Sequence, residues 1–451
     1  MEQTEKILGI FRDWLWGDWL LFALLGAGLL YTILTGAIQI RKFPLIIKKT
    51  LLEPIFHQQS ESREAGTITS FQSLCTAVAS CVGSGNIIGV STAIIAGGMG
   101  AIFWMWAAAL LGMATKYGEI ILGMIYRQKN EEGQYVGGPM YYIEHGLHLR
   151  WLAVLCAGFM VVQIICGNFI QSNTISGIMK ENFGAAPFLT GAVLVVLVFL
   201  ITLGGLKRLA HVAQKMVPFM ATLYVLGGLI IILFNITKLP QVLSDIFCGA
   251  FGLRAVAGGA AGSMIIAMQR GIARGLYSNE AGEGSAPVIH SAASVNHPVE
   301  QGLTGVTEVF LDTFVLCTIS GLVIGVTGVL TPDAVGSTLV INAFASVWPP
   351  MRFVVMFSLL LFCTSTLMSQ WYFGFVGLNY IFNTSVAEKF KYVFPLFCMI
   401  GAVLTIDLVW TLQDIALGLL VIPNLIAIVV LCPKVRAATK DFFEKGGYSA
   451  K

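Results

Sequence analysis

The chain has 451 residues, of which 56% are hydrophobic and only 11% are charged, and its mean hydropathy is +0.81. This composition is far more apolar than that of an average soluble domain and excludes an ordinary globular protein. The net charge of +3 does not indicate nucleic-acid binding, because charge in a membrane protein is informative only loop by loop. We therefore predict an all-α polytopic membrane protein in a lipid bilayer, with no nucleic-acid partner.

Eleven apolar stretches of the chain are predicted to cross a bilayer, which takes about 20 residues in a helix, and the tenth of them is short for a span. In chain order they cover residues 19–40, 70–95, 101–126, 151–179, 187–203, 212–234, 255–276, 301–330, 353–381, 392–406 and 411–431. Without the first span, two sets of five remain, and because five is odd the two sets run in opposite directions across the membrane. That is the topology of an inverted repeat.

We expect four parts: a leading transmembrane helix with an inner loop (1–66), two five-helix repeats (67–235 and 236–432) and a cytoplasmic tail (433–451). With the amino terminus outside, 20 of the 27 lysines and arginines lie on the inner side, Arg270 and Arg274 among them, and 6 lie outside. The positive-inside rule then places the amino terminus outside and the carboxyl terminus in the cytoplasm. The expected location is the plasma membrane, which in a bacterium is the inner membrane.

The second span contains residues 77–90, which read AVASCVGSGNIIGV. Gly83 and Gly85, followed by Asn86, weaken this helix, because each interior glycine costs about 1 kcal/mol relative to alanine. A break here exposes N–H groups at the start of one half-helix and carbonyl groups at the end of the other. Such paired termini attract an anion and a cation side by side. We therefore predict a site for a zwitterion and a metal cation.

The corresponding span of the second repeat, 255–276, is also interrupted, at Gly258, Gly259 and Gly262. Paired broken helices are the best indication in a sequence of a transporter's binding site. The next segment, 275–287, is rich in turn-forming residues and carries two carboxylates at the predicted inner end of the span. It is either a cytoplasmic gate or a simple loop. Short helices at 140–147 and 339–348 are predicted as gates or as interface packing.

Charged residues inside the spans need a reason, because a charge at the centre of a membrane helix costs about 2.5 to 3.5 kcal/mol. Lys116 and Glu119 are three residues apart on one helix face, and we expect them to pair with each other. Glu308 and Asp312 are four residues apart and face the same way. They form either a proton relay or cation site, or a hydrogen-bonded seam between helices.

Uncharged polar residues mark two further spans. Asn168 and Gln171 share a face of the fourth span and either cross-link helices or contact a bound amino acid. Hydroxyls gather in the ninth span at Thr364, Ser365 and Thr366. Because hard cations take oxygen ligands, these hydroxyls suit a monovalent ion, although Ser and Thr also bond back to their own helix.

Several motifs together resemble the sodium:alanine symporter family. The most specific one covers residues 97–112 (GGMGAIFWMWAAALLG). Further matches occur, in order, at 70–76 (SFQSLCT), 82–87 (VGSGNI), 137–140 (GGPM), 278–282 (SNEAG), 284–287 (GSAP) and 309–313 (VFLDT). The resemblance extends over nearly the whole chain from Trp16.

This resemblance implies a LeuT-like fold, with a leading helix before a five-plus-five core whose first and sixth helices are broken. It also implies a non-enzymatic, sodium-coupled symporter that imports small neutral amino acids such as alanine and glycine by alternating access, with a single chain as the unit. The implied substrate-binding residues are Gly83, Ser84, Gly85 and Asn86 at the first break and Gly262 and Ser263 at the second, beside Asn168 and Gln171. The implied sodium ligands are the hydroxyls of Ser365 and Thr366 and the backbone carbonyls near Cys81 and Val82.

The chain departs from the family pattern at Met99, where proline is usual, at Glu283, where a hydrophobic residue is usual, and at 369–370. The added carboxylate of Glu283 keeps a proton-coupled symporter open as an alternative, acting through this residue or through Glu308 and Asp312. A channel is another alternative. An intramembrane enzyme using Glu280, Glu283 and His290 is the weakest, because no motif pairs a nucleophile with a base.

Overall fold

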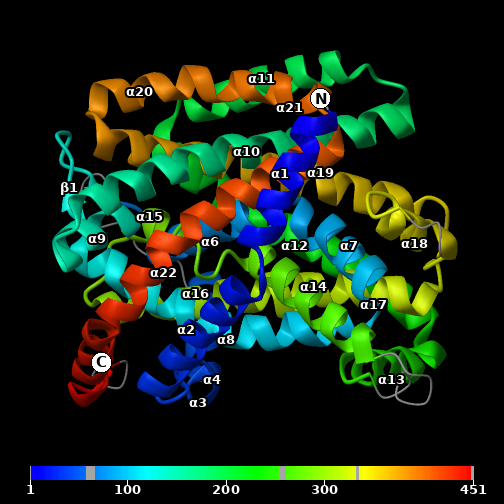
Figure 1. The fold of residues 1–451 in the computed structure, drawn as a ribbon, viewed down its shortest axis with the longest axis horizontal. Helices are drawn as coiled ribbons and strands as arrows, with labels where there is room; N and C mark the ends of the chain where they lie inside the picture. The colour runs from blue at the N-terminus through cyan, green and yellow to red at the C-terminus, as the bar shows by residue number, and fades with distance from the viewer. Residues whose placement is uncertain (1, 57–66, 253–260, 332–334, 448–451) are drawn as a thin grey trace.

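The computed structural model describes residues 2–56, 67–252, 261–331 and 335–447 (Figure 1). These residues form a helical bundle, with one antiparallel hairpin made of β1 (Gln128–Lys129) and β2 (Tyr135–Val136). The hairpin, α9 (Pro139–Leu147) and the carboxyl-terminal end lie together at one end of the bundle in Figure 1. At the opposite end lie α13 (Leu239–Ala250) and α18 (Leu339–Val347).

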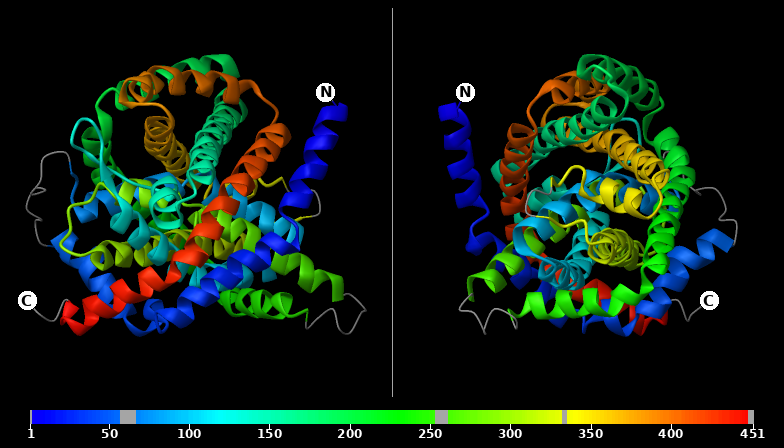
Figure 2. Two further views of the ribbon diagram at one scale, coloured as in Figure 1. Left: turned by 60° about the vertical axis from the view of Figure 1, so that its left-hand side comes forward. Right: turned by 90° about the vertical axis from the view of Figure 1, so that its right-hand side faces the viewer.

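Two helices precede the core. The first predicted span corresponds to α2 (Asp18–Leu34), while α1 (Glu2–Leu15) was not predicted and lies along the outside of the bundle (Figure 2). The buried side chain of Leu15 fits against Gly418, where an added Cβ would lie 2.5 Å from it. Three short helices follow: α3 (Ile38–Arg41), α4 (Phe43–Ile47) and α5 (Glu53–Phe56), with a π-helical turn over Lys48–Leu52 between the last two.

The ten core spans of the prediction each correspond to a helix or a group of helices. The first repeat contains α6 (Ser70–Cys81) with α7 (Ile88–Gly97), α8 (Gly100–Tyr126), α10 (Arg150–Phe183), α11 (Pro187–Thr202) and α12 (Gly205–Phe234). The second contains α14 (Ala261–Asn279) with α15 (Ala286–His290), α16 (Pro298–Val309) continuing through η4 (Phe310–Cys317) into α17 (Thr318–Thr327), α19 (Met351–Ile381), α20 (Thr384–Val393) with α21 (Phe397–Val403), and α22 (Ile406–Glu444).

Within the described residues, seven helices are long and apolar enough to span a membrane, and the bent α6–α7 pair makes an eighth. The shorter or interrupted helices α11, α14–α15 and α20–α21 account for the remaining predicted spans. The predicted short helices at 140–147 and 339–348 are confirmed as α9 and α18. The helix α22 continues past residue 432 to Glu444, so the predicted start of the tail falls inside a helix.

Of the predicted second interruption, Gly258 and Gly259 lie outside the described residues, and the break placed at Gly262 and Ser263 is wrong in position. Both residues lie in the first turn of α14, which is helical to Asn279. The chain leaves the helix over 280–285, where Glu280, Gly282 and Gly284 have φ of 54°, 93° and 86°. A right-handed helix cannot contain such positive φ values, whereas packing can override the modest cost of helical glycines.

The two breaks face each other in the middle of the bundle. A Cβ added at Gly85 would lie 3.1 Å from the ring of Tyr277 and 3.7 Å from the backbone of Ser278. Asn86 and Ser278 also donate hydrogen bonds to the same carboxylate oxygen of Asp312. The second break, over 280–285, therefore lies within the turn-rich segment 275–287, which the sequence analysis had placed at the inner end of a span.

Candidate substrate and cation site

The first break has the geometry that its sequence predicts. Thr69 caps α6 through a reciprocal pair of hydrogen bonds with Gln72, and α6 ends at Cys81. A single 3₁₀ turn, η2 (Ser84–Asn86), then leads into α7, and the two helices meet at a bend of 64°. The Asn86 side chain accepts a hydrogen bond from the Gly83 N–H (3.0 Å), and the Gln171 side chain accepts one from the Ser84 N–H (3.2 Å). Side chains thus satisfy N–H groups that the helix leaves free.

A polar cavity of about 20 Å³ lies between the two breaks. The first break contributes Ser80, Cys81 and Gly85, and the second contributes Tyr277, Glu280 and Glu283. The surrounding helices α10, α19 and α22 contribute Gln163, Gln171, Thr366, Gln370 and Gln413. A cavity of this size holds about one water molecule, so the protein is in a conformation that is closed around the cavity.

Several residues of the predicted site meet at this cavity. Gly85, Gln171, Cys81 and Thr366 line it, and Gly83 lies directly behind, where a Cβ would be 2.8 Å from the Thr366 hydroxyl oxygen. The buried hydroxyl of Ser84 has no hydrogen-bond partner among the described residues. The tight fit at Gly83 explains the glycine, because any side chain there would displace Thr366 or Gln171.

Asn86 and Asn168 do not line the cavity, contrary to the prediction. Asn86 points to α16–η4 and donates to the Asp312 carboxylate (2.5 Å), because it closes the 3₁₀ turn. Asn168 donates to the carbonyl of Phe394 (3.3 Å), which lies in the 3₁₀ turn η5 (Phe394–Leu396) just before α21, because α10 packs against α21. Asn86 therefore shapes the break from behind, and Asn168 links two helices.

The sequence analysis did not name four of the lining residues as site residues, namely Ser80, Gln163, Tyr277 and Gln413. A signal for one of them was present, because Gln163 is two helical turns before Gln171 in the same apolar span. Gln370 was noticed only as a departure from the family pattern. The residues of the second break, Glu280 and Glu283, were assigned to a gate or loop because the break itself was misplaced.

The residues of the predicted sodium site bring oxygen atoms of two helices together. The Thr366 hydroxyl lies 3.1 Å from the Val82 carbonyl oxygen and 3.0 Å from the Phe362 carbonyl oxygen. The Ser365 hydroxyl also lies 2.7 Å from the Phe362 carbonyl, although it faces Met220 of α12. The Cys81 thiol bonds back to Val78 at the end of α6. This set of neutral oxygens fits a hard monovalent cation, which prefers oxygen ligands.

The buried charges around the second break pair differently from the prediction. Lys116 does not pair with Glu119; its ammonium lies 2.5 Å from the Glu308 carboxylate, which His290 also contacts at 3.2 Å. The same ammonium donates to the Asn279 carbonyl (2.6 Å), while Glu119 accepts from the Gly282 N–H (3.3 Å). The two residues of α8 therefore hold the break at its start, through Asn279, and near its middle, through Gly282.

Asp312 connects the two breaks. Its carboxylate accepts hydrogen bonds from Asn86 (2.5 Å) and Ser278 (3.1 Å), and from the neighbouring Thr313 hydroxyl (2.8 Å). Although Asp312 and Glu308 are four residues apart, they serve different partners, because Glu308 is engaged with Lys116. Of the two predicted alternatives, these contacts favour the hydrogen-bonded seam between helices over a shared relay or cation site.

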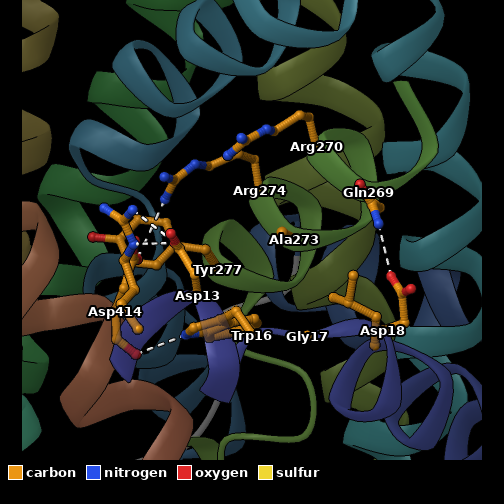
Figure 3. Close-up of a pocket in the computed structure, with 12 residues that line it drawn as sticks. Asp13, Trp16, Gly17, Asp18, Gln269, Arg270, Ala273, Arg274, Tyr277 and Asp414 are labelled. Carbon is orange, nitrogen blue, oxygen red and sulfur yellow. Dashed lines mark hydrogen bonds and ion pairs between the residues drawn. The ribbon is translucent and has the colours of Figure 1, made fainter. Parts of the chain in front are cut away.

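A larger pocket of about 390 Å³ lies on the other side of Tyr277, which lines both spaces (Figure 3). Arg274 reaches Asp414 of α22 at 3.4 Å across it, and the Trp16 indole donates to the Asp414 carbonyl at 2.7 Å. Gln269 donates to Asp18 at 2.7 Å. A closed ion pair and an aromatic ring thus separate this pocket from the small cavity.

This pocket also corrects the predicted positions of two cations. Arg270 and Arg274 line it together with Arg12, Asp13 and Asp18 of the amino-terminal segment. They therefore lie on the same side of Tyr277 as the amino-terminal segment and not with the inner cations. If these two arginines are counted outside, the predicted assignment becomes 18 lysines and arginines inside and 8 outside, so it still predicts an outer amino terminus.

Comparison with known proteins identifies related chains along the whole length. The model of the sodium:alanine symporter family matches residues 1–449. An uncharacterised transporter of Haemophilus influenzae is 42% identical, with 98% of this chain and 96% of the relative covered. The sodium/alanine symporter AgcS of Methanococcus maripaludis is 36% identical, with 97% of each chain covered. The probable sodium/glutamine symporter GlnT of Bacillus subtilis is 37% identical, with 97% and 90% covered.

Solved structures with low sequence identity share the fold. MhsT in complex with L-phenylalanine has a TM-score of 0.62 at 14% identity and covers 85% of this chain and 93% of its own. A sodium-coupled sialic acid symporter has a TM-score of 0.53 at 12% identity, with 86% and 82% covered. The predicted LeuT-like fold is therefore confirmed, and the match to a transporter family along the chain excludes the enzyme reading. With a family model matched over nearly every residue, this chain belongs to the sodium:alanine symporter family.

Proposed function

We propose that this protein imports a small amino acid together with sodium by alternating access, with one chain as the transporting unit. The observation that supports this most strongly is the convergence of both broken helices on one closed polar cavity, with the Thr366 and Val82 oxygens beside it. Membership of a family of cation-coupled amino-acid symporters favours the same function. The names of two relatives suggest which substrates to test, since one is called a sodium/alanine symporter and another a probable sodium/glutamine symporter.

The substrate carboxylate binds the N–H groups of Ser84 and Gly85 at the start of the second half-helix. In the closed conformation the Gln171 side chain takes the Ser84 N–H. As the carboxylate enters, it replaces Gln171 at this N–H group and Gln171 turns to contact the substrate. Gly83 and Gly85 allow this approach, because added Cβ atoms there would meet Thr366 and Tyr277.

Sodium binds between α6 and α19. There the hydroxyl oxygen of Thr366 already lies 3.1 Å from the Val82 carbonyl oxygen and 3.0 Å from the Phe362 carbonyl oxygen. Ser365 completes the set after a rotation of its side chain away from Met220, and the Cys81 carbonyl adjoins it. Because the ion ties the first broken helix to α19, it stabilises one of the two access states more than the other. A ligand with such differential affinity shifts the equilibrium, so the sodium gradient drives uptake.

The amino terminus lies outside in this proposal, and the carboxyl terminus lies in the cytoplasm of a bacterial inner membrane. The pocket between the amino-terminal segment and α14 is then the outer entrance. Arg274, Asp414 and Tyr277 close it, because they lie between this pocket and the cavity.

A proton-coupled symporter is the second candidate. One observation favours it: Glu283 lines the cavity, and one of its carboxylate oxygens is buried without a hydrogen-bond partner among the described residues. A protonated carboxyl group would suit such a place, because burial of an unpaired charge is costly.

Uptake of radiolabelled amino acids into proteoliposomes, with sodium and proton gradients imposed separately, tests the two candidates. We expect accumulation above equilibrium with an inward sodium gradient alone. Accumulation driven by a proton gradient alone would reject sodium coupling. Uptake that never exceeds equilibrium under either gradient would indicate a channel.

A further inference from the structure

We propose that the transported amino acid carries N–H hydrogen-bond donors on its side chain, as a carboxamide or an amine does. This inference rests on the proposed transport of amino acids and specifies which class of side chain the cavity accepts. It is carried by four buried acceptor atoms that converge on the cavity between the two breaks.

The four acceptors are side-chain oxygens that accept no hydrogen bond within the described residues. They belong to Gln163, Gln370, Gln413 and Glu283, and all four residues line the cavity. None of the four is more than 4% exposed. Buried polar groups are nearly always hydrogen-bonded in native proteins. The one water molecule that the cavity holds in this conformation has only two donors, so four unpartnered acceptors indicate that a ligand supplies donors when the cavity is occupied.

The identity of the residues restricts the ligand further. An amide can be turned so that its N–H₂ group faces the cavity in place of its oxygen, but the carboxylate of Glu283 has no such alternative when ionised. An aliphatic side chain would leave all of these groups unsatisfied. A carboxylate side chain would be repelled by Glu283 and by Glu280, whose own carboxylate is bonded to Ser285 at 2.7 Å.

The charges around the cavity also favour a substrate whose side chain carries N–H donors. Two carboxylates line it, and no lysine or arginine does so among the described residues. The nearest cations are engaged elsewhere, since Lys116 is paired with Glu308 and Arg274 with Asp414. One sodium ion and a zwitterion leave the cavity electronegative, which favours donor-bearing or cationic side chains.

The acceptors also lie in a position to meet the side chain and not only the α-ammonium group. Gln163 precedes Gln171 by two helical turns, about 12 Å along α10, and Gln370 follows Thr366 by about one turn of α19. Gln370 lies against Gly167, where a Cβ would be 2.8 Å from its amide. Acceptors therefore extend away from the N–H groups that bind the carboxylate.

Binding of near-isosteric amino acids to the purified full-length protein in sodium tests the proposal. Asparagine, aspartate and leucine have similar shapes, and 2,4-diaminobutyrate adds a cationic amine. We expect asparagine or diaminobutyrate to bind at least tenfold more tightly than leucine and aspartate. If asparagine binds more tightly than diaminobutyrate, the substrate has a carboxamide side chain. If diaminobutyrate binds more tightly, the substrate has an amine side chain.

Other outcomes separate this inference from the proposed function. If leucine or alanine binds most tightly, the inference is wrong and sodium-coupled transport of amino acids still stands. If no amino acid binds in sodium, the proposed function fails and this inference fails with it.

Variants of the cavity glutamines test whether their side-chain oxygens cause the preference for asparagine over leucine. Gln370→Met and Gln163→Met remove one amide each while keeping a side chain of similar length, and either should lower the affinity ratio of asparagine to leucine at least fivefold. Gln128→Met on the hairpin is the matched control and should leave the ratio unchanged. An unchanged ratio in both cavity variants, with the proteins folded, would overturn the proposal.

Discussion

The two breaks at the centre of the bundle are stabilised by different interactions. The first, between α6 and α7, is uncharged, and neutral side chains bond its free N–H groups. The second, between α14 and α15, contains two carboxylates and is fixed by Lys116 at Asn279 and by Glu119 at Gly282. Glycine also serves different purposes, since Gly83 and Gly85 make room for neighbours whereas Gly282 and Gly284 adopt positive φ.

This difference indicates that the two breaks bind different parts of the substrate. The first break presents backbone dipoles in an uncharged setting, which suits the carboxylate of a substrate and a sodium ion. The second break presents negative charge to the same cavity, which suits ammonium and N–H groups. Changing each break separately should therefore affect stability, substrate binding and sodium binding to different extents.

The largest effect is expected at the charges that hold the second break. Lys116→Met leaves the Glu308 carboxylate buried without its ammonium partner, and breaking such a pair costs about 3 to 5 kcal/mol. Thermal unfolding of the detergent-purified protein should show a large fall in Tm. Lys440→Met removes an exposed lysine that lies 3.5 Å from Glu444 and should change little. Equal Tm values for the two variants would contradict the role given to Lys116.

Substitutions at the first break should remove binding without unfolding. Gly85→Leu should abolish substrate binding, and Gly85→Ala should weaken it at least tenfold, about 1.4 kcal/mol, because a Cβ lies 3.1 Å from the Tyr277 ring. Equilibrium binding of the labelled amino acid measures this. Gly89→Ala, four residues later in a place with nothing within 4 Å, is the control. Wild-type affinity in Gly85→Leu would refute the site.

A smaller and more specific effect is expected for the cation. Thr366→Val keeps the shape of the side chain but removes the hydroxyl beside the Val82 carbonyl. A lost contact to a charged group is worth about 1.5 to 3 kcal/mol, so the sodium concentration for half-maximal uptake should rise about tenfold or more. Thr364→Val on the same helix is the control. A sodium dependence equal to that of the control would exclude Thr366 as a ligand.

The smallest effect is expected at the outer entrance. The Arg274 and Asp414 side chains are 20% and 13% exposed, and ion pairs near water contribute at most about 1 kcal/mol. Asp414→Asn should therefore slow uptake by about fivefold or less, while sodium-dependent binding at equilibrium stays within twofold. A large loss of equilibrium binding would place Asp414 in the substrate site and not in the gate.

Local patterns in the sequence were sufficient for most of the architecture. Apolar stretches of the right length identified every core helix, and Gly83, Gly85 and Asn86 identified the first break, because these residues lower the local helix propensity. The motif at residues 97–112 identified the family. Thr366 and Gln171 were found because polar groups in apolar spans require partners.

Tertiary structure decided what those groups contact. The sequence could not show that Lys116 pairs with Glu308 in place of Glu119, or that Asn168 faces α21 while Gln163 faces the cavity, because each choice depends on which helix lies opposite. It also misplaced the second break, because a glycine inside a helix, such as Gly262 in α14, and glycines that take positive φ, such as Gly282 and Gly284, are indistinguishable as letters. Helix and membrane propensities are local and can be summed along a chain, whereas partners and backbone angles are set by neighbours distant in sequence.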